Sequence, residues 1–275
     1  MDLEKFENLL KLADSDKVDM LPLLHSSINE TPDVDLSDVE PIIPLLPVRG
    51  NVVFPIILMP IAAGRKKSIQ LLKDSFKDKK TIGVVSQNND KDEPTMDDLF
   101  KVGVLAKVHE VFTLQDDSVM VVLQGIERFN LTEFIDGKDY WRCTWSINPD
   151  GCKKLPKDAT IFSDTLKDMF VQLLGMMPNV PSGALLGPKN IKNPYYLLNH
   201  VAAQLDIKLE DKQKLLEIND FKKRIQKVIA YLSEEIKKQE IKQQIQKKAS
   251  NDLNKQQREY YLNQQLKTIQ EELGG

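Results

Sequence analysis

The chain has 275 residues, of which 41% are hydrophobic and 29% are charged, a composition that excludes a disordered or membrane-embedded chain. Its 38 Lys and Arg against 41 Asp and Glu give a net charge of -3, which excludes nucleic-acid binding driven by overall charge. The length predicts about two domains at a typical ~150 residues each. Two cysteines are too few for a disulfide-stapled secreted scaffold, so a cytoplasmic location is expected.

Residues 1–41 are predicted to form a flexible acidic segment. Residues 1–40 carry three lysines against eleven acidic residues, and only residues 4–13 show the spacing of a short helix. The N-terminus has neither a basic start nor an apolar run, so no signal peptide is predicted. The most apolar stretch, residues 41–63, contains five prolines, so no membrane-spanning helix is expected there.

Residues 42–150 are predicted to form a β-rich domain of roughly five to seven strands, as a sheet or a barrel. Strand-like runs cover residues 42–48, 51–58, 81–87 and 102–114, and residues 65–76 have helical spacing. Trp141, Cys143, Trp145 and Ile147 alternate with polar residues, which predicts a strand with one buried face. We expect this strand to pair with residues 126–135 through a turn at Asp136-Gly137, so that residues 102–147 form a meander.

Residues 151–219 are predicted to be a helical subdomain, and residues 220–275 a single long helix. Apolar residues from Ile161 to Leu174 predict a helix that ends at Gly175, before a loop over residues 175–190. No Pro or Gly occurs between Pro194 and Gly274, which predicts helix throughout. A short helix is expected from Asp211 or Lys212, and Asn219 and Asp220 can cap the last helix. That helix would be about 80 Å long at ~1.5 Å per residue, too long to bury within its own domain.

The long helix carries two coiled-coil-like blocks. Four apolar residues in each block follow a 4-3-4 spacing: Phe221, Ile225, Val228 and Leu232 in the first, and Leu262, Leu266, Ile269 and Leu273 in the second. Between residues 245 and 253 the seam is weak, because Lys248 and Asp252 occupy positions where apolar residues are expected. A second apolar face is formed by Tyr260, Tyr261, Leu262, Leu266 and Ile269, and we expect it to pack against another subunit or module.

The chain is predicted to be non-catalytic, with no catalytic, cofactor-binding or metal-binding residues. Residues 183–190 have the wrong glycine spacing and lack the hydroxyl of a phosphate-binding loop. The three histidines are far apart in sequence, none with a carboxylate or Cys at metal-ligand spacing, so we expect them at the surface or half-buried. Cys143 is expected in the core, and Cys152 is expected in a turn as a thiol without a structural or chemical role.

Two segments could bind a partner. The five apolar residues Met176, Met177, Val180, Leu185 and Leu186 lie in a proline-broken loop, and flexible Met-rich loops suit promiscuous recognition. The alternative, which we favour from composition, is that they pack against the rest of the fold. Residues 222–248 hold nine Lys and Arg against three acids and could contact DNA or polyphosphate, although a solvated helix face fits better because no aromatic residues are interleaved.

Five segments carry a resemblance to a known family: residues 43–49 (IPLLPVR), 53–55 (VFP), 64–69 (GRKKSI), 97–107 (DDLFKVGVLAK) and 257–274 (QREYYLNQQLKTIQEELG). Together they closely resemble the amino-terminal region of bacterial Lon, the ATP-dependent protease. The resemblance covers residues 42–275 and implies an α+β chain: a β-rich PUA-like domain, then a helical bundle ending in a long coiled-coil-like helix. It further implies that the chain stops before the AAA+ ATPase module, so ATP, magnesium and the serine peptidase residues would belong to the missing part.

The function implied by the resemblance is that of a non-catalytic N-terminal domain. Such a domain of a cytoplasmic Lon-type serine protease would recognise damaged, unfolded or tagged proteins and help to organise the homohexamer, with no membrane partner. Two alternatives stay open. The chain could be a stand-alone PUA-like module that binds nucleic acid or a small ligand, or a structural coiled-coil spacer without affinity for unfolded chains.

Overall fold

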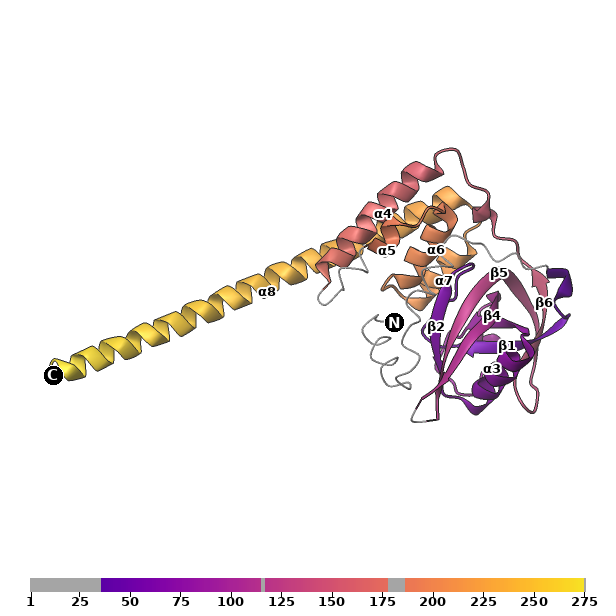
Figure 1. The fold of residues 1–275 in the computed structure, drawn as a ribbon, viewed down its shortest axis with the longest axis horizontal. Helices are drawn as coiled ribbons and strands as arrows, with labels where there is room; N and C mark the ends of the chain where they lie inside the picture. The colour runs from indigo at the N-terminus through magenta and orange to yellow at the C-terminus, as the bar shows by residue number, and fades with distance from the viewer. Residues whose placement is uncertain (1–35, 115–116, 178–185, 275) are drawn as a thin grey trace.

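The computed structural model describes residues 36–114, 117–177 and 186–274, and shows a strand-rich body, a helical body and one long projecting helix (Figure 1). Six strands precede the helical body: β1 (Ile42–Val48), β2 (Leu58–Ala63), β3 (Thr81–Ser86), β4 (Val102–Thr113), β5 (Val119–Ile135) and β6 (Arg142–Ile147). The α+β class predicted from the sequence is confirmed. The predicted helix at residues 4–13 lies outside the described residues.

The strands form one mixed sheet that closes on itself. Their order is β2-β5-β4-β3-β1-β6, and β5 also pairs with β6, so five strands form a ring and β2 is attached to β5 outside it. β1 and β3 are parallel, while every other pair is antiparallel. β4, β5 and β6 follow one another as antiparallel neighbours, which confirms the predicted meander. Helix α3 (Lys66–Asp78) corresponds to the helix predicted at residues 65–76.

The ring encloses a small apolar core centred on Phe129, which is fully buried. Gly103 allows the ring of Phe129 to reach this position, because a Cβ on Gly103 would lie 2.8 Å from Phe129 and 2.5 Å from the carbonyl oxygen of Val84. Trp141 and Cys143 belong to the same core, as the strand pattern predicted. The predicted buried face does not extend to the end of β6, because Trp145 is only half-buried and Ile147 is exposed.

Residues 51–57 form a loop, so the strand predicted at residues 51–58 is wrong. Pro55 has no N–H to donate, and Ile56 adopts a φ of +58°, in the left-handed region that a β-branched residue rarely occupies. The chain therefore turns at these two residues and enters β2 afterwards. The apolar run resembled a strand because the side chains of this loop are buried in the main core.

The helical body consists of α4 (Ala159–Met176), α5 (Leu186–Lys189), α6 (Pro194–Gln204), α7 (Leu209–Glu217) and the first part of α8 (Phe221–Glu272). Helix α4 continues through Gly175 by one residue, against the prediction that it ends there. The strands and these helices share one large apolar core, which joins residues such as Leu46, Leu72 and Val121 to Leu198 and Leu232. The four-part division of the chain predicted from the sequence stays a prediction.

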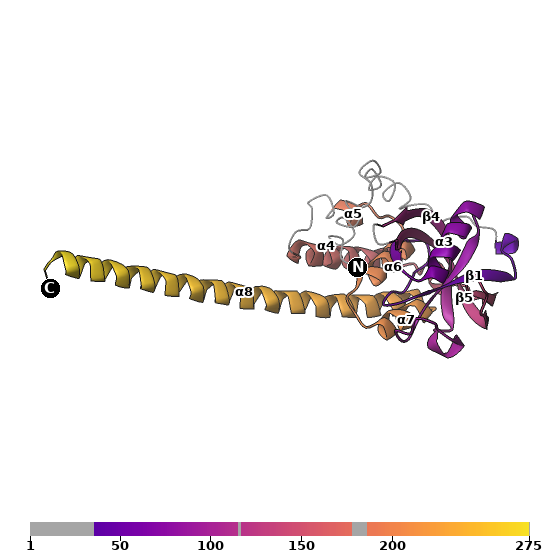
Figure 2. The ribbon, with the colours of Figure 1, turned by 90° about the horizontal axis from the view of Figure 1, so that it is seen from below.

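Helix α8 leaves the helical body and projects far beyond it (Figures 1 and 2). Its 52 residues span about 78 Å at ~1.5 Å per residue, which confirms the predicted long helix. Asp220 caps it by accepting a hydrogen bond from the Lys223 N–H (2.8 Å), as predicted. None of the helices within the described ranges combines the length and the hydropathy that a membrane span requires.

Candidate functional site

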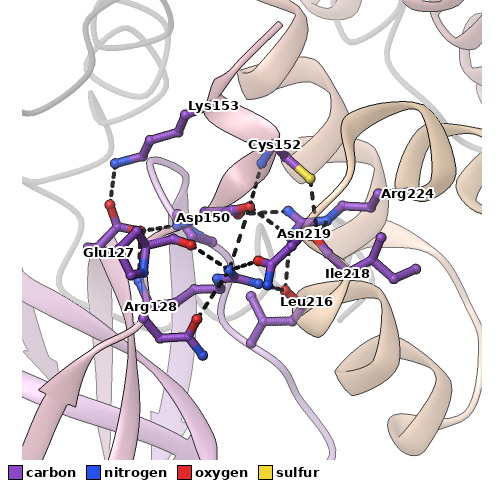
Figure 3. A network of polar contacts seen from close by, with 12 residues as sticks. Glu127, Arg128, Asp150, Cys152, Lys153, Leu216, Ile218, Asn219 and Arg224 are labelled. Carbon is purple, nitrogen blue, oxygen red and sulfur yellow. Dashed lines mark hydrogen bonds and ion pairs between the residues drawn. The ribbon is translucent and has the colours of Figure 1, made fainter.

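A buried ionic network lies where the strand-rich body meets the helices (Figure 3). Asp150, just after β6, is fully buried and accepts two hydrogen bonds from the guanidinium of Arg224 in the first turn of α8, at 2.9 and 3.0 Å. The same carboxylate accepts the Tyr195 hydroxyl of α6 (3.0 Å) and the Cys152 N–H (3.0 Å). Two parallel bonds between a guanidinium and a carboxylate fix both distance and orientation.

Arg128 enters this network from β5. Its guanidinium donates to the carbonyl oxygens of Leu216 (2.6 Å) and Pro149 (2.9 Å) and to the side-chain oxygen of Asn219. It also lies 3.9 Å from Asp150, and both side chains are completely buried. Arg128 therefore ties the sheet to the loop between α7 and α8 through charge-assisted hydrogen bonds.

Both arginines donate hydrogen bonds to carbonyl groups at the C-terminal end of α7. Arg224 donates to the carbonyl oxygens of Leu216 (2.9 Å) and Ile218, two groups that α7 leaves without helical partners. A cation at a helix C-terminus is also favoured by the helix dipole. The network thus supplies hydrogen-bond partners to the carbonyl groups at the end of α7 and links them to the start of α8 and to β5. In this way it sets the direction in which α8 leaves the body.

The short segment after Asp150 is adapted to this close packing. A Cβ on Gly151 would lie 2.2 Å from the carbonyl oxygen of Asn219, so only glycine fits there. Cys152 is fully buried and its Sγ donates to the Ile218 carbonyl oxygen (3.3 Å), so the prediction of a thiol without a structural role is wrong. Burial raises the pKa of the Cys152 thiol to about 12, which keeps it protonated.

A second ion pair stands beside the network. Glu127 precedes Arg128 in β5, pairs with Lys153 and accepts the N–H groups of Arg128 (3.1 Å) and Asp150 (3.2 Å). The network and this ion pair together form a junction between the sheet and the helices. This junction contains two carboxylates, Glu127 and Asp150, and three cations, Arg128, Lys153 and Arg224, and each of them has a partner. No side chain in it is left as an unpaired acid, base or nucleophile, so its geometry supports positioning rather than chemistry.

The sequence did not identify this junction. Glu127, Arg128, Asp150 and Arg224 belong to no motif and are separated by up to 97 positions, so no local pattern connects them. A weak signal exists in Glu127, which shares the strand phase of Phe129 and Leu131 and so places a charge at a position where an apolar residue is expected.

The predicted apolar loop is only partly described. Met176 ends α4, packs partly buried against the main core, and accepts a hydrogen bond from Gln243 of α8 at its carbonyl oxygen (3.1 Å). Met177 is half-buried. Val180 and Leu185 lie outside the described residues, and Leu186 begins α5. Met176 therefore packs partly against the core, and a binding role for the five residues stays a prediction.

The distal part of α8 exposes its apolar residues. Tyr260, Tyr261, Leu262, Leu266 and Ile269 are between 50% and 66% exposed, whereas Phe221, Ile225, Val228 and Leu232 at the proximal end are buried. The eight lysines of residues 222–248 are also exposed: Lys222, Lys223, Lys227, Lys237, Lys238, Lys242, Lys247 and Lys248. Lys222 pairs with Asp158 (2.7 Å), and Arg224 of the same run is buried in the junction.

The remaining candidates for chemistry do not form a site within the described ranges. No group of three His, Cys, Asp or Glu residues there could hold a metal ion. His109 is exposed and forms a hydrogen bond with the side chain of Gln124, and His200 stacks on Tyr196. The described part of the glycine-containing segment, residues 186–190, consists of the single helical turn α5 and the residue after it, and it carries no hydroxyl that could hold magnesium. These described residues do not fit a site for ATP and magnesium.

Comparison with known proteins points to one family. Residues 42–234 match the family model of the ATP-dependent protease La (LON) substrate-binding domain. The chain is 37% identical over 271 residues to a Lon protease of Flavobacterium johnsoniae, covering 98% of the chain and 33% of that protein. It is 35% identical over 268 residues to a Lon protease of Cytophaga hutchinsonii, covering 96% and 32%. The chain thus spans about a third of these curated relatives.

The fold agrees with a solved structure. The N-terminal domain of the Mycobacterium avium complex Lon protease superimposes with a TM-score of 0.56 at 17% identity, covering 70% of this chain and 98% of that one. At this identity the likeness concerns the fold alone.

Proposed function

The chain belongs to the LON substrate-binding domain family, and from this we propose that it binds unfolded, damaged or tagged polypeptides on behalf of an ATP-dependent serine protease. The observation that carries the proposal is the family match over residues 42–234, which contains the whole sheet, the helical body and the junction between them. The described residues offer surfaces for binding and no arrangement of groups for hydrolysis. We assign a non-catalytic role to the chain, in the cytoplasm.

We also propose a role for α8. It leads toward an ATPase module in which ATP and magnesium act. The distal face at residues 260–269 packs against that module or against other subunits of a homohexamer. The exposure of five large apolar side chains on an isolated helix supports a packing partner. The junction would then hold the binding body at a fixed angle to the helix that connects it to the motor.

Substrate binding through the apolar loop is part of this proposal. Met177 is half-buried at the end of α4, and Val180, Leu185 and Leu186, which follow it in the sequence, are apolar. A capture module must release its cargo, so modest affinity is expected for one copy, with avidity supplied by several copies. Apolar burial at ~25 cal/mol per Å² offset by chain ordering gives micromolar or weaker binding.

The test is a comparison of one probe protein in two states. Fluorescence anisotropy should show binding of reduced, carboxymethylated α-lactalbumin, which is permanently unfolded, and no binding of the native form. Replacing Met177 and Leu186 by Ser should weaken binding without changing the melting temperature. Replacement of Met176 by Ser is the matched control, because its packing against the core predicts a loss of stability instead. Equal affinity for both states of the probe would contradict the proposal.

The alternative partners are nucleic acid and polyphosphate. The exposed lysines of residues 222–248 could make a weak contact with them. The family match does not favour this as the main function. A steep loss of binding to a labelled oligonucleotide between 50 and 200 mM salt, together with no binding of the unfolded probe, would favour it instead.

A further inference from the structure

Among the described residues, strand β2 has a strand beside it on one edge only. It pairs with β5, in an unbroken register from Leu58 opposite Gln124 to Ala63 opposite Val119. No backbone hydrogen bond outside the sheet involves residues 58–63 within the described part of the chain. The outer edge of β2 therefore presents main-chain donors and acceptors that no described residue pairs with.

The direction of these groups follows from the neighbouring residues. Gly125 of β5 donates its N–H to the Ile57 carbonyl oxygen (3.1 Å), so the carbonyl group of Ile57 points toward β5. Direction alternates along a strand, so Met59, Ile61 and Ala63 also point toward β5, while Leu58, Pro60 and Ala62 point away. Pro60, which has no N–H, occupies an outward position, as prolines in edge strands do.

The edge of β2 differs from another open edge of the described sheet, that of β4. β4 pairs with β3 only as far as Lys107, so residues 108–113 also form an edge. That edge carries His109 and Glu110 and an irregularity in register between Val108 and Glu110, which are common protections against further pairing. β2, with the sequence LMPIAA, has neither a charge nor a bulge, and Ala62 is exposed. Only Pro60 limits pairing there, by removing one donor.

We propose that the outer edge of β2 binds an extended segment of an unfolded polypeptide as an additional strand. This inference rests on the proposed function and names a site for it. Leu58 and Ala62 can each donate and accept a hydrogen bond, and Pro60 can accept one. Hydrogen bonds to the main chain do not depend on the side chains of the bound segment, so such a site has little sequence preference. An uncharged edge also suits the apolar segments that unfolding exposes.

The test is residue-resolved amide exchange by NMR on the whole chain, with and without reduced, carboxymethylated α-lactalbumin. The amides of Leu58 and Ala62 should exchange more slowly in the complex. The amides of Met59, Ile61 and Ala63, already bonded to β5, should not change. This alternation is specific to strand addition, because a side-chain contact would not distinguish odd from even positions.

Two variants provide the matched pair. Ala62→Pro removes the outward N–H and should lower the affinity for the unfolded probe about fivefold, the effect of roughly one lost hydrogen bond, whereas Ala62→Ser keeps the N–H and should bind as the parent does. Binding without protection of Leu58 and Ala62 would overturn the inference and leave the proposed function standing. Absence of any binding of the probe would overturn both.

Discussion

Asp150 is the residue on which the junction depends most directly, because its carboxylate faces two buried arginines and a buried tyrosine hydroxyl. The desolvation cost of the charges is offset only while all partners are present. Its removal would leave Arg128 and Arg224 without the carboxylate between them. The burial of Tyr195 beside this carboxylate raises the pKa of its phenol, so the hydroxyl stays a donor throughout the ordinary pH range.

Asp150→Ala should lower the free energy of unfolding by about 3 to 5 kcal/mol, as expected when one partner of a buried ion pair is lost. Urea denaturation of the whole chain measures this. Asp92→Ala is the matched control, because Asp92 pairs with Arg49 at the surface (2.7 Å) and the loss of an exposed ion pair should change the free energy of unfolding far less than the loss of Asp150. Equal effects of the two substitutions would show that the junction does not carry the stability assigned to it.

The two thiols should be unreactive in the folded chain. Cys143 and Cys152 are both fully buried, and burial raises the pKa of each to about 12, above the ordinary value of 9. Each group is therefore protonated at pH 8, where a free thiol would be partly ionised. Iodoacetamide at pH 8 should label neither cysteine in the native chain and both in urea, as read by mass spectrometry. Rapid native labelling of Cys152 would mean that the segment at Gly151–Lys153 opens.

At the scale of elements, the sequence was informative where the pattern is local. Helix α8 was predictable because no Pro or Gly interrupts it and Asp220 supplies its cap. β2 was not, because the apolar run before it is buried as a loop around Pro55 and Ile56. The junction was also not predictable, since the arrangement of Arg128, Asp150 and Arg224 depends on how sheet and helices pack.

The two halves of α8 should contribute very differently to stability. Beyond Ile236 the described side chains are mostly exposed, so the distal half has little apolar burial to lose. A chain that ends at residue 248 should therefore melt within about 2 °C of the full chain. Leu232→Ala, in the buried half, is the comparison and should cost about 2 to 5 kcal/mol. A large drop in melting temperature after truncation would place a contact for the distal half within the same chain.

At the scale of the whole molecule, the strand-rich and helical bodies should behave as one protease-resistant unit, because one apolar core and one ionic network join them. Limited trypsin digestion should first remove the acidic N-terminal residues and then cut α8 at Lys247, Lys248 and Lys255. Lys153 and Lys154, between sheet and helices, should resist cleavage because the surrounding backbone is held by Asp150. Early cleavage at these two lysines would separate the bodies into independent domains.

The described part of the chain thus consists of a body of sheet and helices, a buried junction between them, and a helix that extends from this body (Figure 1). The most direct test of its role is photo-crosslinking of benzophenone-labelled, reduced and carboxymethylated α-lactalbumin to the whole chain, with the contacts mapped by mass spectrometry. We expect crosslinks within residues 42–234 and none on the distal helix at residues 255–274. Crosslinks confined to the distal helix, or no crosslinks above those of native α-lactalbumin, would contradict it.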